Sequence, residues 1–454
     1  MTLTLNHKIP AKRSTLTGPH PAAYQAPART NPPWVDWLTM FLLIGNTANP
    51  FFYQSVEMLF ASFIVLLGIW FFVIEDNTRL NQQFWTYIIV LTLLQACQII
   101  EYHLFPVKTF MGEYLRIAFC VLAMRIIGPR FFDLFVKFVY VFGVISLCFY
   151  IPCVLIKPLA HFLTDHVAKY TQSPFHRSFA GDMYDSPGNM IIYNLGQIDL
   201  KRNSGFYWEP GTQGGFMCLA LFINLFYRKE KLTSKINLVF LLVILTTLST
   251  TTYLALFFVI IAYLKNFFIK RPFIAVFLLL GMAVIGFFAY QKLDFLHKKI
   301  DQQIEKSDSR QAGESRFSSL NADLVTVKEH PLIGTGRNVE MHFGKNFYNT
   351  DIRELHRNNG IGVLLSTYGL PFFFFFLYFN WLSFRRLLND PVNASLLLTL
   401  VLIISFSEDY FFKAFFIGLA LYCGITMPTG NRPAVTRRSG KMQLGGKTLT
   451  HEYD

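Results

Sequence analysis

Residues 131–156, which read FFDLFVKFVYVFGVISLCFYIPCVLI, form an apolar run whose only charged residues lie near its start. A helix needs about 20 such residues to cross the ~30 Å hydrocarbon core of a bilayer. The apolar residues are continuous rather than alternating, which favours a helix over a strand of a membrane barrel. We therefore interpret 131–156 as a membrane-spanning helix.

Apolar runs of comparable character recur along the whole chain. They lie at 35–49, 56–74, 84–104, 112–128, 131–156, 210–227, 236–248, 252–264, 273–290, 360–384, 394–407 and 410–427. The 454-residue chain is 53% hydrophobic and 17% aromatic, with only 15% charged residues, which is too apolar for an ordinary soluble domain. The sequence therefore predicts an all-α polytopic membrane protein with about 12 transmembrane helices.

The apolar stretch from 236 to 264 is interrupted by the polar sequence TTLSTTT at 246–252. A single helix here would place the basic segments 228–235 and 265–271 on opposite sides of the membrane, whereas a hairpin returns both to one side. We therefore expect two helices joined by a turn.

Two long polar stretches, 157–209 and 291–356, separate the apolar runs. The first 34 residues are rich in Pro, Ala and Thr, and they lack the short apolar core of a cleavable signal peptide. Residues 428–454 are polar and basic. These features predict disordered tails at 1–34 and 428–454 around a transmembrane domain at 35–427.

The formal charge of +13 is distributed unevenly. Lys and Arg gather in the tails and in the short loops assigned to the cytoplasm, whereas the opposite short loops hold only Lys108. The positive-inside rule then places both termini in the cytoplasm and both long loops outside. Because the basic residues punctuate helix ends rather than one folded face, no nucleic-acid partner is indicated.

Metal and cofactor motifs are not apparent in the sequence. The six cysteines all fall in predicted helices, so neither a disulfide framework nor a thiolate metal site is indicated. The outward loops lack an Asp-x-Asp pair, and the chain lacks a Walker-type glycine loop. We therefore expect chemistry without a metal and without a cofactor.

The first long loop ends in the motif RNSGFYWEPG at 202–211. Arg202 has the planar fork of donors that binds phosphate or diphosphate groups, and the following aromatic residues suit the membrane interface. Interfacial anchoring is the alternative role for this segment. Glu209 precedes a predicted helix, where it is a catalytic candidate, or alternatively a helix cap or an ion-pair partner of Arg202.

The second long loop contains a short amphipathic helix. Phe317, Leu320, Leu324 and Val327 share one helical face, and the sequence HPLIGTG at 330–336 ends the pattern. Docking of this apolar stripe onto the membrane domain would hold Arg316 close to it, which makes Arg316 a second candidate for phosphate binding.

His356 stands just before the apolar run that starts at 360. An imidazole at a water-accessible helix start can serve as a general base, although a lone histidine is more often structural. Arg337 and Asn359 are weaker candidates for substrate binding. Arg116 and Arg125 lie inside a predicted crossing, where the cost of an unpaired charge makes us expect them to face the bundle interior.

At these residues the chain resembles the bacterial O-antigen ligase and polysaccharide polymerase family, whose members are integral membrane glycosyltransferases. The similarity spans roughly residues 200–375. It rests on the segment at 202–211, Ser-Arg-Phe at 315–317, HPLIGTG at 330–336, and His356 with Asn359 ahead of Tyr-Gly-Leu at 368–370. One departure is Ser249-Thr250, where family members often carry a Ser-Arg pair.

The resemblance implies a large helical fold similar to GT-C-like glycosyltransferases and a donor glycan carried on a polyprenyl diphosphate. Arg202 and Arg316 would hold the diphosphate, and His356 would activate the acceptor hydroxyl. The domain at 35–427 would be the glycosyltransferase, in the bacterial inner membrane with its active site facing the periplasm. Chain-length regulator and flippase proteins are possible partners.

Three functions follow from these features. The first is a polymerase that adds a growing polyprenyl-linked chain to a new lipid-linked repeat unit, because the 202–211 pattern looks more like polymerases than ligases. The second is a ligase or protein O-oligosaccharyltransferase that uses the same donor. The third, from a different class, is a lipid-linked glycan flippase, but the sequence lacks the two-half symmetry common among transporters.

Overall fold

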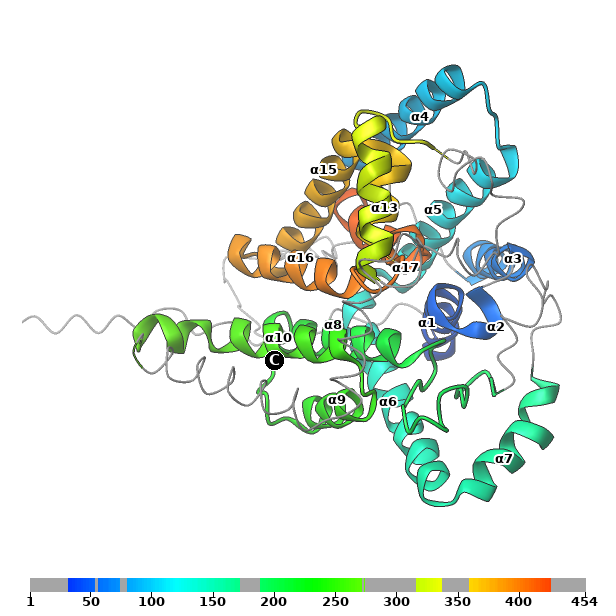
Figure 1. Ribbon diagram of the computed structural model, residues 1–454, viewed down its shortest axis with the longest axis vertical. Helices are drawn as coiled ribbons and strands as arrows, with labels where there is room; N and C mark the ends of the chain where they lie inside the picture. The colour runs from blue at the N-terminus through cyan, green and yellow to red at the C-terminus, as the bar shows by residue number, and fades with distance from the viewer. Residues whose placement is uncertain are drawn as a thin grey trace, which may run out of the picture.

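The computed structural model describes residues 32–53, 56–73, 80–171, 188–271, 273, 316–336 and 359–425. Helices dominate these ranges, which contain no β-sheet and only two isolated bridges. The α-helices are α1 (Pro33–Ala48), α2 (Pro50–Tyr53), α3 (Val56–Val73), α4 (Gln82–Tyr102), α5 (Val107–Ile127), α6 (Phe131–Leu155), α7 (Lys157–His166), α8 (Pro210–Phe226), α9 (Lys235–Thr246), α10 (Thr250–Lys270), α13 (Arg316–Glu329), α15 (Gly360–Leu388), α16 (Pro391–Ser405) and α17 (Ala414–Leu421). The all-α prediction is confirmed for the described residues (Figure 1).

The predicted apolar runs coincide with helices wherever the structure describes them, whereas 273–290 lies outside the described residues apart from Phe273. The run 410–427 contains α17 between the 3₁₀ turns η5 (Tyr410–Phe412) and η6 (Tyr422–Gly424). Among the described residues, three helical stretches are long and apolar enough to cross a membrane. They are Gln82–Tyr102, Val107–Leu155 and Gly360–Leu388. The count of about 12 crossings stays a prediction.

Local chemistry sets where several helices begin and end. Asn81 caps α4 by accepting a hydrogen bond from the Phe84 N–H, and Asp390 caps α16 through the Val392 N–H. Between α5 and α6, Gly128 adopts a φ of 67° and ends α5, because a residue with a Cβ rarely takes that conformation. The 49-residue stretch from Val107 to Leu155 is therefore divided into two helices, as expected.

The interrupted stretch at 246–252 does divide into two helices. α9 ends at Thr246, α10 begins at Thr250, and Leu248 in the turn has a positive φ of 48°. The Tyr253 hydroxyl donates to the Leu245 carbonyl across this turn at 2.9 Å. The predicted two-helix segment is thus confirmed.

α8 is the central helix of the bundle. Its residues are buried along almost its entire length, and it contacts α6, α9, α10 and α16. Aromatic rings fill the space between α6, α8 and α17: the Phe135 and Phe415 rings stack at 4.8 Å, and the Phe216 ring lies 5.6 Å from that of Phe415. Buried aromatic area of this kind contributes strongly to a core.

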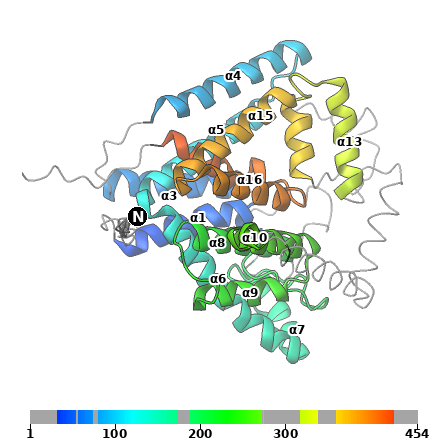
Figure 2. The ribbon, with the colours of Figure 1, turned by 90° about the vertical axis from the view of Figure 1, so that its left-hand side faces the viewer.

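α7 and α13 belong to the two long polar stretches, and both lie at the same end of the bundle (Figure 2). α13 runs across the ends of the bundle helices there and packs against α15 (Figure 2). The first stretch also contains a helix, α7, which the sequence did not predict. The described parts of both stretches therefore share one face of the molecule.

α15 is broken at Gly369, although the sequence predicts one continuous helix at 360–384. Gly369 has φ 79° and ψ 173°, and Pro371 follows inside the helix. The HPLIGTG segment docks at this break: the Thr335 N–H donates to the Ser366 carbonyl at 2.8 Å, and the Leu370 N–H donates to the Pro331 carbonyl at 2.8 Å. The break frees backbone groups of α15 that anchor the end of α13.

Candidate active site

The two polar stretches meet where many helices begin or end. α8, α10, α13 and α15 start in this region, and α9 and α16 end there. Contacts join their ends: Glu209, just before α8, reaches Arg316 at the start of α13, and Asn359, just before α15, donates to the Arg316 carbonyl at 3.5 Å. Because helix N-termini carry partial positive charge, their convergence favours a bound anion.

Arg316 lies at the centre of this cluster. Its Nη2 atom is 2.8 Å from Oε1 of Glu408 and 4.0 Å from Oε1 of Glu209. The Arg316 side chain is 25% exposed, so it is partly buried yet reachable from solvent. A guanidinium in this setting can bind phosphate oxygens more strongly than one in open water.

Glu408 completes the cluster, although the sequence did not point to it. Burial raises its pKa well above the usual range for a glutamate, and the charge of Glu209 raises it further, against the lowering effect of Arg316. The raised pKa favours the protonated, neutral form of Glu408. The two arginines would then carry two positive charges against the single negative charge of Glu209.

One sequence signal could have identified Glu408. It belongs to the polar break between the apolar runs 394–407 and 410–427. The predicted topology places that break on the same side of the membrane as both long loops. Two adjacent acidic residues, Glu408 and Asp409, in a short turn on the outer side could therefore have been predicted as candidate site residues.

Arg202 is half-buried beside the turn between α9 and α10. Its Nε atom donates to the Thr247 carbonyl at 3.3 Å, in the turn between α9 and α10. Burial lowers the pKa of Arg202, and the negative charge of Glu209 acts in the opposite direction. Glu209 thus lies within the electrostatic reach of both arginines, which brings the two predicted phosphate-binding residues into one site.

The backbone around Arg202 is fixed by buried amides. The Asn203 side chain donates to Thr246 Oγ1 at 2.9 Å and accepts from the Gly205 N–H at 3.1 Å. Gly205 has a φ of 52°, and a Cβ there would lie 2.4 Å from Oε1 of Gln213. Only glycine fits this position, so the motif at 202–211 is a rigid element rather than a loose interfacial segment.

Glu209 does not act as a helix cap. It occupies the position before α8, but its side chain makes no capping hydrogen bond. Its carboxylate instead points toward Arg316, and Gly211 leaves room for it, because a Cβ at that position would lie 2.7 Å from Glu209 Oε1. Of the roles considered for Glu209, the structure favours an electrostatic partner of the site arginines.

Asn359 has a clear structural role. Its side chain is fully buried, and its Oδ1 atom accepts from the Ile361 and Gly362 N–H groups at 3.1 and 3.0 Å, which caps α15. Its amide nitrogen also reaches the Arg316 carbonyl, so Asn359 joins α13 to α15. Direct binding of substrate by Asn359 stays a prediction. His356 and Arg337 lie outside the described residues.

The prediction that α13 docks through its apolar stripe holds only in part, because Val327 is buried and Leu320 is partly buried, but the other two residues of the stripe are not. Phe317 and Leu324 are 50% and 39% exposed, whereas Ser319 and Asp323 are fully buried against the neighbouring elements. The reason is the polar surface that α15 offers: Ser366 Oγ donates to Asp323 Oδ1 at 3.0 Å. Ser319, Asp323 and Thr326 also share one helical face, and this pattern could have been read from the sequence.

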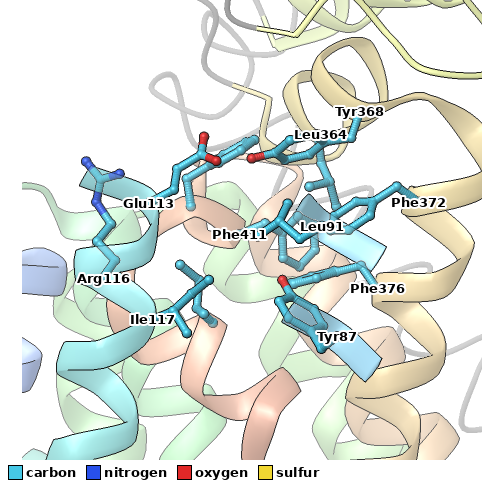
Figure 3. A pocket seen from close by; sticks show the side chains of 12 residues that line it. Tyr87, Leu91, Glu113, Arg116, Ile117, Leu364, Tyr368, Phe372, Phe376 and Phe411 are labelled. Carbon is cyan, nitrogen blue, oxygen red and sulfur yellow. The ribbon is translucent and has the colours of Figure 1, made fainter. Parts of the chain in front are cut away.

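A cavity between α4, α5 and α15 is separate from the charged cluster (Figure 3). It contains about 360 Å³ of unfilled space, part of which is open to the outside, and aromatic rings make up much of its wall. Glu113 lies at one end and Tyr87 at the other (Figure 3). Gln95 Nε2 donates to Glu113 Oε2 at 2.6 Å. The cavity lacks the paired arginines that a diphosphate requires, so it is not the candidate site.

The two arginines predicted inside a membrane crossing have local partners. Arg116 is one of the residues that line the cavity, in agreement with a position toward the bundle interior. The Arg125 guanidinium lies 4.5 Å from the centre of the Trp70 ring, a cation–π contact that reduces the cost of placing its charge in the membrane.

Residues 236–377 match the family model described as O-Antigen ligase. The matched region runs from α9 into α15, so it contains Arg316 and Asn359, whereas Arg202 and Glu209 precede it and Glu408 follows it. No curated protein and no solved structure matches the chain. The match confirms the resemblance to the O-antigen ligase and polymerase family, whose members are glycosyltransferase-like membrane enzymes.

Proposed function

We propose that this protein, whose residues 236–377 match the O-antigen ligase family model, is a polymerase of lipid-linked oligosaccharide repeat units. The donor is a growing glycan on a polyprenyl diphosphate, and the acceptor is a new repeat unit on the same kind of lipid. The product would be an O-antigen, a capsule or an exopolysaccharide. Transfer takes place at the outer face of the bacterial inner membrane, with both termini in the cytoplasm.

The observation that carries this proposal is the contact of Arg316 with Glu209, whose negative charge also acts on Arg202. The two arginines come from polar stretches more than 100 residues apart in the sequence, yet both lie within reach of one carboxylate. Together with the converging helix N-termini, they supply the fixed positive charge that a departing diphosphate needs. Arg337 is a further candidate contact for the same diphosphate.

Transfer is proposed as a single displacement at the anomeric carbon. The acceptor hydroxyl attacks that carbon, the bond from carbon to phosphate oxygen breaks, and the diphosphate leaves with its bonding electrons. The anomeric centre is therefore inverted. His356 takes the hydroxyl proton, while Arg202 and Arg316 stabilise the growing negative charge without a metal ion. Glu209 tunes the charge of the arginine pair.

The alternative is an O-antigen ligase or a protein O-oligosaccharyltransferase, which would use the same donor site. The family match is common to ligases and polymerases, so the nature of the acceptor separates them. A flippase remains the third candidate, but the buried arginine–carboxylate cluster favours chemistry on a diphosphate. Chain-length regulators and flippases are proposed as cellular partners of the polymerase.

A reconstitution assay tests these functions. Purified protein in lipid is mixed with polyprenyl-diphosphate-linked repeat units, and the glycans are separated on a gel. A ladder of products supports the polymerase. A single shifted product that needs an added lipid core or protein acceptor supports a ligase, and unchanged glycan that moves across the bilayer supports a flippase. The His356→Ala variant should form no product in the first two cases.

A further inference from the structure

Glu408 lies in the turn between α16 and η5, where it contacts the first residue of α13. Its Oε1 atom accepts a hydrogen bond from Arg316 Nη2 at 2.8 Å. The same Nη2 atom also faces the Glu209 carboxylate at 4.0 Å. Two carboxyl groups from distant parts of the chain therefore hold one guanidinium.

Two glycines make room for this pair of carboxyl groups. A Cβ at Gly360 would lie 2.4 Å from the Glu408 carbonyl and 2.8 Å from the Ser405 carbonyl. A Cβ at Gly211 would lie 2.7 Å from Glu209 Oε1. Because any larger residue would displace one of the carboxyl-bearing segments, the arrangement is built into the backbone on both sides of Arg316.

Glu408 and Asp409 are adjacent in the sequence but differ in their charged partners and in their burial. Asp409 Oδ1 pairs with Lys413 Nζ at 3.1 Å and is 37% exposed, whereas the Glu408 side chain is 12% exposed. Among the described residues, the titratable groups that interact with Glu408 are Arg316 on α13, Glu209 before α8, and Asp409 and Tyr410 on its own segment, with Lys413 paired to Asp409. Glu408 is the more buried of the two adjacent acids, and it contacts the site arginine.

We propose that Glu408 is a positioning residue that, together with Glu209, holds Arg316 ready for the diphosphate and controls anion binding through one exchangeable proton. This inference rests on the proposed function. With the proton in place, Glu408 is neutral and Arg316 keeps its full attraction for an anion. When the proton leaves, a second carboxylate competes with the diphosphate for the same guanidinium.

The direction of the pH dependence follows from this exchange. Burial and the Glu209 charge raise the pKa of Glu408, so its proton is lost at a higher pH than that of an ordinary glutamate. Binding of the diphosphate should weaken as the pH rises through that raised pKa, and it should be strongest below it. The binding of an anion should in turn raise the pKa of Glu408 further, because the two are linked.

The test measures the affinity of the full-length protein in detergent for polyprenyl diphosphate across a range of pH. Wild-type affinity should fall by about tenfold or more as Glu408 loses its proton. Glu408→Gln keeps the shape and an oxygen that accepts from Arg316 but cannot ionise, so its affinity should lack this fall. Asp409→Asn is the matched control: it removes a neighbouring charge but keeps the proton of Glu408, so the fall in affinity with rising pH should remain, with its midpoint at a somewhat lower pH.

A second variant tests the positioning role. Glu408→Ala removes both the group that holds Arg316 and the exchangeable proton, so we expect binding weaker than that of the wild type at low pH and no fall in affinity as the pH rises. Glu408→Gln should bind as well as the wild type at low pH. If Glu408→Gln kept the wild-type pH profile while binding still depended on Arg316, this inference would be overturned but the proposed function would stand. Absence of polyprenyl diphosphate binding by the wild type at every pH would overturn both this inference and the proposed function.

Discussion

Residues 188–209 and α13 each bring an arginine to the same site, but different interactions hold them. The first segment is fastened by buried amides, including Asn49 Nδ2, which donates to the Phe206 carbonyl at 2.6 Å. Phe206 and Tyr207 are almost fully buried in the aromatic core. α13 instead rests on a largely polar face that includes the buried Val327, and on an ion pair, with Phe317 half exposed.

This difference suggests a division of labour between the two arginines. Arg202 belongs to a segment that is continuous with the core, so its position should change little when a ligand binds. Arg316 sits at the first position of a docked helix, and its guanidinium is balanced between two carboxyl groups. We infer that Arg202 supplies a fixed reference point and Arg316 the adjustable contact.

Removal of the adjustable contact should have the largest effect. Arg316→Ala takes away the guanidinium at the centre of the cluster, so product formation should fall by about 10²–10³-fold or more. The assay is the gel ladder from lipid-linked repeat units. Lys328→Ala, which removes an exposed cation from the same helix, should keep the ladder. A normal ladder from Arg316→Ala would remove this residue from the site.

Removal of Arg202, the fixed arginine, should lower product formation nearly as much. A conservative change should show whether the planar shape of the guanidinium matters. Arg202→Ala should weaken the ladder almost as much as Arg316→Ala does, whereas Arg202→Lys should restore part of it, because lysine keeps the charge but loses the planar fork of donors. Lys201→Ala is the neighbouring control and should be active. Full activity in Arg202→Ala would show that the rigid segment serves only as a structural anchor.

The docking of α13 can be broken without touching any charge. A Cβ at Gly362 would lie 2.5 Å from Asp323 Oδ2, so Gly362→Ala should displace α13 from α15 and cost about 1–3 kcal/mol of stability. Thermal unfolding and product yield should both decline. Gly68→Ala is the matched control, because a Cβ at Gly68 meets nothing within 4 Å. Equal behaviour of the two variants would contradict the tight contact.

Loss of a buried amide from residues 188–209 should change activity less than loss of an arginine, but it should change stability measurably. Asn203→Ala leaves Thr246 Oγ1 and the Gly205 N–H without their buried partner, at a cost of about 1–3 kcal/mol. Thermal unfolding in detergent measures this cost, with the exposed Thr86→Ala as a control. An unchanged unfolding temperature would mean that the rigidity of this segment comes from its aromatic residues alone.

The smallest effect should come from the apolar residues of α13 that face outward. Leu324→Ser should change the unfolding free energy by no more than about 0.5 kcal/mol, because the side chain is 39% exposed. Ser319→Leu on the opposite, fully buried face should be clearly destabilising. The reverse result would restore the apolar stripe as the docking face.

The sequence was sufficient to place most of the described helices, although not α7. Continuous apolar runs, the polar interruption at 246–252 and the capping residues each act over a few neighbouring positions, so local patterns predict them. The two arginines were candidates because a guanidinium has the planar fork of donors that binds phosphate groups, and their role stays a prediction. Their meeting beside Glu209 depends on helices distant in sequence, and only the fold reveals it.

The parts that were missed depend on contacts between elements. The orientation of α13 was predicted only in part, because the sequence of one helix does not show the contacts that it makes with Ser366 and Gly362 on α15. The break at Gly369 arises from hydrogen bonds with residues 331–336, not from the glycine alone. Glu408 was overlooked because a short turn between two apolar runs carries no spacing motif.

The affinity of the purified protein for polyprenyl diphosphate in lipid nanodiscs tests the central claim most directly. The wild type and Lys328→Ala should bind it, whereas Arg316→Ala and Arg202→Ala should each bind at least about tenfold more weakly, as expected for the loss of a charge-assisted contact. Equal affinity in all four proteins would contradict the assignment of this arginine cluster as the diphosphate site.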